Sequence, residues 1–515
     1  MKAIRLGLCA LVMTCLAPAQ EFRATMTGRV MDAQGAVVPG VKVVLTQVQI
    51  RANHETVSGG DGGYTVPFLP PGAYRLTAEA PGFKRFVRDG LHVSTGDRIA
   101  LDITLEVGQL AETVTVTADA SLLETATASS GQVINERQIE NLPMNGRTPL
   151  VLAQAAFGVI PNSDPRFYRP FDNAGPSGFS MGGAPAQTNE LLLDGAPDTT
   201  RNNRVAYNPP VDTVTEVKVE TFQADAAYGH TGGGTVNVVM RGGTNALHGK
   251  AYDFNQVSKL AATPFFTNKA GLKKPVTRYN QWGVNAGGPV IIPKIIDGRN
   301  KFFFYFAYEG IKDSFPEPLT STVPTAAQRN GDFSQLLSVG SNYQLYDPLS
   351  GATEGTRIRR QPFVNNIIPA NRQSAIAKNY FQFYPQPNQP GRADGQDNFL
   401  ANSVRGDDFN NELGRLDFNL SDRHKMFFNF RHNERLEYRG NRFFNIATGN
   451  FLKRVNWGSM LDDVYTFTPT MVLNTRFNWT RFTEGSTRPS DGFDFTTLGF
   501  RLPSPRLPPS ACCRR

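Results

Sequence analysis

A chain of 515 residues is too long for one ordinary domain and predicts several. With 48 Gly, 35 Pro, 36 Phe and only 19% charged residues, its composition favours short strands and turns over helical bundles or disorder. The net charge of +8 comes from scattered Lys and Arg, densest at Arg357, Arg359 and Arg360, which we interpret as solvated surface, so no nucleic-acid partner is predicted. We expect a mainly β protein.

The N-terminus has the features of an export signal. Lys2 and Arg5 precede an apolar run over residues 6–16, and the small-x-small pattern of a signal peptidase site ends at Ala19. The apolar run is too short to cross a bilayer as a helix. The sequence therefore predicts a cleaved signal peptide over residues 1–19 and an exported chain that begins near Gln20.

Cysteine usage limits how the exported chain is stabilised. Cys9 and Cys15 fall within the predicted signal, and Cys512 and Cys513 lie at the far C-terminus. The body of the exported chain has no cysteine, so its stability cannot rest on disulfides.

Residues 20–106 are predicted to form a small β-sandwich. The segment GRVMDAQGAVVPGVKVVLT indicates a strand, a turn and a second strand, with Val41, Val43 and Leu45 on one face. The segment GGDGGYTVPFLPPGAYRLTAEAPGFK repeats this pattern, with Gly and Pro supplying turns. Its apolar positions are Tyr64, Val66, Phe68, Tyr74 and Leu76.

A motif in this region resembles a known module. The pattern D-x-x-G-x-Y-x-x-x-x-L-x-P-G-x-Y-x-L runs from Asp61, with one residue inserted before Pro71, and is similar to the carboxypeptidase regulatory-like, transthyretin-like module. The resemblance implies no catalysis. His54 and His92 are isolated, and no Glu, His and Asp cluster has metal-ligand spacing. We therefore predict no catalytic residue, no cofactor and no metal ion.

The linker over residues 107–128 contains the stretch ETVTVTA, which alternates threonine with apolar residues as an exposed strand would. One interpretation is the last strand of the sandwich. The other is a free strand offered to the sheet edge of a partner protein, where main-chain hydrogen bonds give affinity. The residues concerned are Glu112, Thr113, Val114, Thr115, Val116, Thr117 and Ala118.

Residues 129–244 carry three distinctive segments, LPMNGR, LLLDG and AYGHTGGGTVNVV. Spacing around Ile134, Ile139 and Leu142 predicts a helix that ends at Pro143, and later segments predict short strands. The glycines at 229–234 are not a phosphate loop, because no Gly-Lys-Ser/Thr follows and TVNVV is a strand.

Together these segments resemble the plug domain of TonB-dependent outer-membrane receptors of the Oar-like branch, a likeness that covers most of residues 22–483. The resemblance implies that residues 112–118 are the TonB box. On that interpretation the strand has no partner within the chain because its partner is TonB.

Residues 245–515 are predicted to begin an outer-membrane barrel, whose strands are about ten residues long with alternating apolar and polar side chains. For example, Leu416, Phe418 and Leu420 alternate with polar residues, and aromatic residues on both faces of KFFFYFAY fit an interfacial girdle. The predicted strands are 249–256, 281–292, 301–310, 412–420, 425–433, 456–467 and 471–482.

The predicted connections alternate in length. Those at 293–300, 421–424 and 468–470 are short, as periplasmic turns are, whereas 257–280, 311–411 and 434–455 are long, as outer loops are. Within 311–411 we expect a structured outer loop with a short helix near residues 374–383, although the sequence does not identify which outer-loop residues bind a ligand.

The C-terminus departs from the family. A plugged barrel needs about 22 strands, more than the seven predicted here, and the chain ends in the basic, proline-rich LPSPRLPPSACCRR rather than on a strand. We interpret the barrel as incomplete, through a frameshift or a truncated gene, so a remnant without function is one alternative.

The leading functional hypothesis is a TonB-dependent receptor in the outer membrane of a Gram-negative bacterium, which uses energy delivered by TonB to take up a large substrate. A second hypothesis is a surface adhesion or binding protein without transport. Iron chelates, glycans, peptides and exported proteins all stay open as substrates, and the sandwich could gate, dock or signal.

Overall fold

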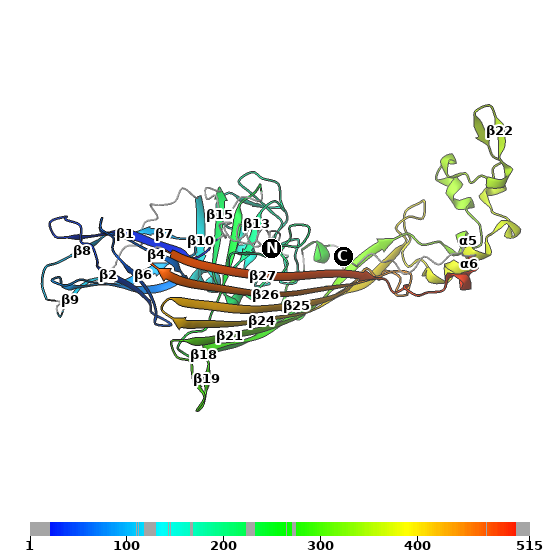
Figure 1. The fold of residues 1–515 in the computed structure, drawn as a ribbon. Coiled ribbons are helices and arrows are strands. Elements are labelled where there is room, and N and C mark those ends of the chain that lie inside the picture. The colour runs from blue at the N-terminus through cyan, green and yellow to red at the C-terminus, as the bar shows by residue number, and fades with distance from the viewer. Residues whose placement is uncertain are drawn as a thin grey trace, which may run out of the picture.

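The computed structural model describes residues 21–500 except 110, 112, 118–129, 143, 145, 165–167, 223–231, 264, 270–273, 275 and 470. The described residues are mainly β, and they form a two-sheet unit, a second mixed unit and a large open sheet with a lobe at its far end (Figure 1). The predicted signal peptide at 1–19 and the basic C-terminus at 501–515 lie outside the described residues.

The N-terminal unit is a sandwich of two sheets. The first sheet has the order β4-β1-β7, with β8 also paired to β1, and the second has the order β3-β2-β5-β6-β9. The strands are β1 (Ala24–Asp32), β2 (Lys42–Gln47), β3 (Ala52–Val57), β4 (Gly63–Leu69), β5 (Gly72–Glu79), β6 (Arg85–Val93), β7 (Arg98–Ala100), β8 (Ile103–Leu105) and β9 (Thr113–Thr117).

Apolar residues fill the space between the two sheets. Val41, Val43 and Leu45 are fully buried on one face, as their alternation predicts. Phe68 departs from the alternation: the β1–β4 register shifts near this end of β4, Phe68 takes a positive φ of 58°, and Leu69 is buried instead. As a result Phe68 faces away from the core.

The second unit, residues 130–240, is a five-stranded sheet of order β10-β15-β16-β13-β14 with short helices. Ile134 lies in β10, so the predicted helix begins later, where Asn135 caps α2 through a capping box with Gln138. Its elements are β10 (Ser130–Asn135), α2 (Glu136–Asn141), α3 (Leu150–Ala153), β11 (Val159–Pro161), β12 (Phe179–Met181), β13 (Glu190–Leu193), β14 (Ala196–Pro197), η2 (Val211–Thr213), β15 (Val214–Phe222) and β16 (Thr235–Met240).

Two sequence motifs of this unit have clear structural roles. In LLLDG, Asp194 and Gly195 both have positive φ, 48° and 74°, which a two-residue hairpin between β13 and β14 requires. TVNVVM is the fully buried strand β16, as predicted. Residues 223–231, which include part of the glycine cluster, lie outside the described residues.

The third unit is an antiparallel sheet of seven long strands that does not close into a barrel. All seven strand predictions for this region are confirmed in position. The strands are β17 (His248–Val257), β18 (Arg278–Pro289), β21 (Phe302–Ser321), β24 (Phe399–Ser421), β25 (His424–Arg439), β26 (Asn450–Thr468) and β27 (Met471–Thr487). Between them lie η3 (Ser258–Leu260), α4 (Phe265–Lys269), β19 (Ile291–Ile292) and β20 (Ile296–Asp297).

The strands extend further from the sandwich than predicted, most clearly in β21 and β24, which have 20 and 23 residues. The connection was predicted to begin at 311 because residues 311–411 lack clear strand alternation and contain many Pro, Asn and Gln residues, among them Pro316 and Pro318. However, β18 pairs with β21 only as far as Ser314, so beyond that residue β24 is the one strand neighbour of β21 among the described residues, and the other edge can accept residues without an N–H. The long connection therefore spans 322–398 rather than 311–411.

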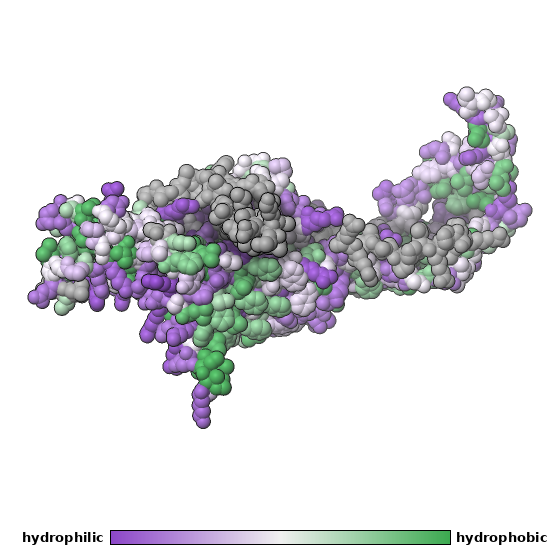
Figure 2. All heavy atoms as spheres, in the orientation of Figure 1, coloured by the Kyte–Doolittle hydropathy of each residue, from purple (hydrophilic) through white to green (hydrophobic). Residues whose placement is uncertain are grey.

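The two faces of the seven-stranded sheet differ as an outer-membrane wall requires. Outward residues such as Leu473, Phe477 and Trp479 are exposed, and hydrophobic residues gather over the middle of the sheet (Figure 2). The opposite face packs on the second unit: Tyr305 and Leu413 join the apolar core of that unit. Among the described residues, no helix is long and apolar enough to cross a membrane.

A lobe of short elements extends beyond the far end of the sheet (Figure 1). The helix predicted near 374–383 is confirmed as α6 followed by η9. The elements are α5 (Ala326–Arg329), η4 (Ser334–Ser338), η5 (Ser341–Tyr343), η6 (Pro348–Ser350), β22 (Ala352–Glu354), β23 (Arg357–Arg359), η7 (Val364–Asn366), η8 (Ala370–Arg372), α6 (Ala375–Tyr380) and η9 (Phe381–Phe383), with η10 (Phe495–Leu498) from the end of the described chain.

Candidate functional site

The alternating stretch after the sandwich has a strand partner in its own chain. β9 runs parallel to β6, with Thr113 opposite Arg85 and Thr117 opposite Asp89. The prediction that this strand is unpaired within the chain is therefore wrong. Alternation of threonine and valine identifies a half-exposed strand, but it carries no information about which neighbour supplies the hydrogen bonds.

β9 is nevertheless lightly held. It lies at the end of its sheet, and among the described residues only β6 pairs with it. Val114 is half-buried while Thr113 and Thr115 are exposed, so the strand contributes little to the core. Glu112 and Ala118 lie outside the described residues, and the side chains of Val116 and Thr117 are not described. One edge of β9 thus has main-chain groups available for another strand.

The N-terminal segment ties the sandwich to the wall of the large sheet. Arg23 donates to Asp462 of β26 at 3.0 Å and to Glu21 at 2.7 Å, and Arg476 of β27 donates to the same Asp462 at 2.7 Å. The Arg23 and Asp462 side chains are almost wholly buried. Because each buried charge has an opposite partner, this network fixes the segment in one position.

Two further contacts connect the sandwich to its neighbours. The Thr95 amide donates to the Glu216 carboxylate of β15 at 2.8 Å, and Lys425 of β25 donates to the main-chain oxygen of Asn53 at 2.7 Å. Burial raises the pKa of Glu216, whereas the hydrogen bonds from Thr95 oppose that rise. The sandwich therefore contacts both the second unit and the wall.

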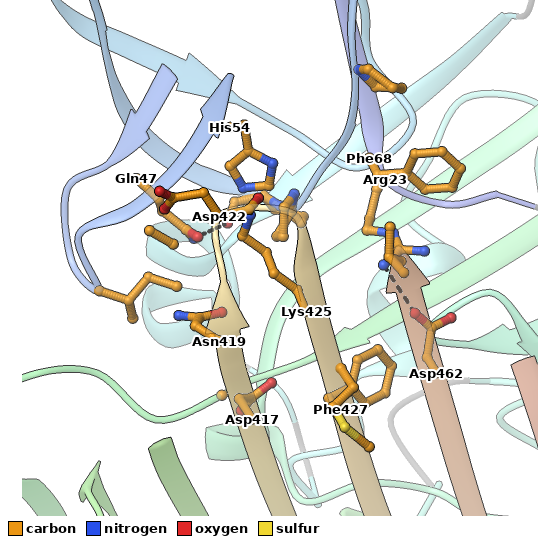
Figure 3. A pocket seen from close by; sticks show the side chains of 18 of the residues that line it. Arg23, Gln47, His54, Phe68, Asp417, Asn419, Asp422, Lys425, Phe427 and Asp462 are labelled. Carbon is orange, nitrogen blue, oxygen red and sulfur yellow. Dashed lines mark hydrogen bonds and ion pairs between the residues drawn. The ribbon is translucent and has the colours of Figure 1, made fainter. Parts of the chain in front are cut away.

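A cavity of about 770 Å³ lies where these three units meet. Figure 3 shows His54 and Gln47 of the sandwich on one side and Asn419, Lys425 and Asp417 of the large sheet on the other. Such a volume is in the range of small-molecule and peptide pockets. Sequence reasoning missed this site because its walls come from residues far apart in the chain.

Two buried polar side chains beside the cavity each have one atom without a partner among the described residues. His54 and Gln47 are 8% and 7% exposed, and neither the Nε2 atom of His54 nor the Oε1 atom of Gln47 has a hydrogen-bond partner. Burial first, and then the positive charges of Lys425 and Arg23, hold the pKa of His54 well below its ordinary value, so the ring is neutral. Within the described residues, no group of three His, Cys, Asp or Glu side chains could hold a metal ion.

The second unit is fixed to the large sheet by its own charged contacts. Asp194, at the turn of the LLLDG motif, pairs with Arg415 of β24 at 3.1 Å and accepts from the Met240 amide at 2.9 Å. Burial raises the pKa of Asp194, and Arg415 opposes that rise. The motif thus places a carboxylate against the sheet wall.

The outer lobe is organised around Arg329, which donates to the carbonyl oxygens of Phe381, Tyr384 and Pro385. Its surface carries apolar side chains: Leu349 and Val364 are both about four-fifths exposed. No ligand contact is assigned to any of these residues.

Comparison with known proteins identifies the class. A family described as an outer membrane beta barrel domain matches residues 239–511, and a carboxypeptidase regulatory-like domain matches residues 25–106. The chain therefore belongs to the outer-membrane β-barrel domain family, with a carboxypeptidase regulatory-like domain ahead of the barrel. The barrel domain indicates the outer membrane as its location.

The chain is also similar to one curated protein. The chain is 24% identical to the TonB-dependent transporter Oar of Myxococcus xanthus over 281 residues, which is 53% of this chain and 26% of the relative. The chain thus spans about a quarter of that relative's length.

Among solved structures, the outer membrane transporter YddB from Escherichia coli shares 10% identity with a TM-score of 0.44, over 70% of this chain and 39% of that chain. The siderophore receptor PirA from Pseudomonas aeruginosa shares 13% identity with a TM-score of 0.36, over 70% and 42%.

Proposed function

We propose that this chain belongs to an energised receptor that takes up a large substrate across the outer membrane of a Gram-negative bacterium. In this proposal the domains are a signal peptide at 1–19, the sandwich at 20–106, the TonB-box linker at 107–128, the plug at 129–244 and barrel strands from 245 onward. TonB is the partner and its strand joins residues 112–118.

The observation that carries this proposal is the free edge of β9. A strand added there would gain main-chain hydrogen bonds without moving any buried side chain, which is how extended partners are bound at sheet edges. β9 also lies directly between the sandwich and the plug in the chain, so a pull applied to it reaches both. Force from TonB would then shift the plug away from the wall and open a path.

Two proline variants test this proposal. Consecutive residues of a strand direct their N–H groups to opposite edges, so of Val114→Pro and Thr115→Pro one removes a donor to β6 and the other a donor on the free edge. We expect at least one of them to lose retention by an immobilised periplasmic fragment of TonB. The matched control is Ala111→Pro, at an exposed turn residue just outside the strand.

The result separates two modes of binding. Loss only in the variant that lacks the free-edge donor indicates addition to the free edge, and loss in both indicates that β9 leaves β6 first. Equal retention of the parent chain and both variants would overturn the TonB-box assignment. Recovery of every variant from outer membranes shows that insertion is intact.

A second candidate is a surface binding protein without transport, favoured by the apolar side chains of Leu349, Ile358 and Val364 on the outer lobe. It predicts that ligand binding by cells is the same with and without TonB.

A further inference from the structure

The sandwich is joined to its neighbours without a shared apolar core. Among the described residues, the core of the sandwich and the core of the second unit have no residue in common. Ion pairs and hydrogen bonds connect the units instead, around a cavity of about 770 Å³. Polar interfaces between domains of one chain permit relative motion. The sandwich should therefore be able to separate from the rest of the molecule without unfolding.

The segment at residues 21–23, ahead of β1, lies where all three units meet. Phe22 packs against Gly195, the turn of the hairpin β13–β14 in the second unit, and Arg476 of β27 donates to the Gly195 carbonyl oxygen at 3.4 Å. A Cβ atom at Gly195 would lie 2.9 Å from Cδ1 of Phe22 and 3.0 Å from Nη1 of Arg476. Because Gly195 has no Cβ, the hairpin can contact the N-terminal segment and the large sheet together.

The charged part of this segment is buried and paired. Arg23 donates to Glu21 at 2.7 Å and to Asp462 of β26 at 3.0 Å (Figure 3). Its guanidinium also lies 5.0 Å from the centre of the Phe68 ring, so Arg23 contacts both the sandwich and β26. Asp462 has a second partner in Arg476 at 2.7 Å. Replacement of Arg23 therefore removes the connection without leaving the buried carboxylate of Asp462 unpaired.

We propose that residues 21–23 form a clasp that holds the hairpin β13–β14 against the large sheet while the sandwich is docked, and that undocking of the sandwich releases the hairpin. Phe22 carries the contact to the hairpin, and Arg23 carries the contact to β26. The inference rests on the proposed function only in taking residues 129–244 as the part that moves. It gives the sandwich a regulatory role, as a domain that must detach before the second unit can leave the wall.

Hydrogen exchange on the purified full chain in detergent tests the clasp. In Arg23→Met, the amides of residues 190–197 should exchange at least about tenfold faster than in the parent, while β1 to β6 keep their protection. The ion pair of Asp194 with Arg415 remains, so a local opening is expected. The matched control, Arg75→Met, removes an arginine from an exposed pair and should leave exchange at 190–197 unchanged.

Two results would overturn the proposal at this stage. Parent-like exchange at residues 190–197 in Arg23→Met would mean that the segment does not hold the hairpin. Loss of protection throughout β1 to β6 would mean that Arg23 is needed for folding of the sandwich rather than for its docking.

A disulfide tests whether docking of the sandwich controls the hairpin. The amide of Asn245, just before β17, donates to the main-chain oxygen of Gln49 in the sandwich at 3.3 Å. A main-chain hydrogen bond of this kind places the two Cα atoms about 5.5 Å apart, within the span of a disulfide. Gln49→Cys and Asn245→Cys are combined with Arg23→Met in an exported chain that carries Cys512→Ser and Cys513→Ser.

Oxidation of this pair should return exchange at residues 190–197 to the parent rate, and reduction should raise it again. The control pair, Lys42→Cys and Val57→Cys, joins neighbouring strands inside the sandwich and should have no such effect. Fast exchange that persists after oxidation would contradict control by docking, and a disulfide that does not form without Arg23→Met would contradict the docked arrangement itself. Neither measurement uses TonB, so failure of the proposed function and failure of this inference are seen separately.

Discussion

The sandwich and the seven-stranded sheet use the same alternation of apolar and polar residues in opposite ways. In the sandwich, Val43, Leu45 and Leu76 point into a closed apolar core. In the large sheet, Phe477 points outward and is 64% exposed, while the side that faces the second unit buries polar residues such as Glu309. A period of two therefore decides which residues share a face, and the surrounding medium decides which face is apolar.

Because of this difference, the cost of burying charged side chains falls mainly on the large sheet. Buried charges on the side that faces the second unit need partners: Arg435 pairs with Asp407 at 2.7 Å and Glu437 at 3.1 Å, and its guanidinium lies over Phe171. In the sandwich, the pair of Arg75 with Asp89 is exposed to solvent. Removal of an arginine from an ion pair should thus lower stability much more in the large sheet than in the sandwich.

The largest expected effect is that of Arg435→Met. It removes the Arg435 guanidinium from two buried carboxylates, which keep only Arg405 and, for Glu437, Arg439, and breaking buried pairs of this kind costs about 3–5 kcal/mol. The matched control, Arg75→Met, removes a solvent-exposed pair and should leave stability almost unchanged. Denaturant unfolding of the chain in detergent measures both, and a similar cost for the two variants would erase the contrast between the units.

A core substitution in the sandwich comes next. Leu76→Ala deletes part of a fully buried side chain, so the sandwich should lose roughly 2–5 kcal/mol of stability. Hydrogen exchange should show the loss in β1 to β9 and leave the large sheet protected. Val48→Ala, at an exposed position, serves as the control. Equal deprotection of the large sheet would mean that the two units unfold together.

The smallest of the three effects concerns the outer face of the wall. Phe477→Lys places a charge where hydrocarbon is expected, at a cost of roughly 2–4 kcal/mol near the bilayer centre and less toward its edges. The fraction of chain recovered in outer membranes should fall, while Phe477→Leu should behave as the parent. Full insertion of the lysine variant would mean that this face meets water.

The sequence predicted the positions of the strands more accurately than the pairing between them. The seven wall strands and α6 were predictable because alternation and helix spacing are local signals. The outer half of β21 was not predicted, because its prolines and its lack of clear alternation are typical of a loop. Pro316 and Pro318 are nevertheless tolerated in the strand, because this part of β21 is not paired with β18. The pairing of β9 with β6 was also missed, because both a docked and a free strand alternate.

The junction cavity was beyond sequence reasoning altogether. Gln47, His54 and Lys425 are ordinary residues in their local context, and only the docking of the sandwich brings them together. The one local hint was Phe68, an apolar residue at an alternate position close to Pro67, Pro70 and Pro71, yet its turn away from the core depends on the irregular register between β1 and β4.

The Arg23 network has a consequence for how the protein is assembled. Arg23 and Asp462 are 439 positions apart, so the segment ahead of β1 can be fixed on the large sheet only after β26 has formed. Contacts so distant in sequence form late. The sandwich can fold first, but it can dock on the large sheet only after β26 and β27 have inserted in the membrane. The docked state therefore marks a late stage of assembly.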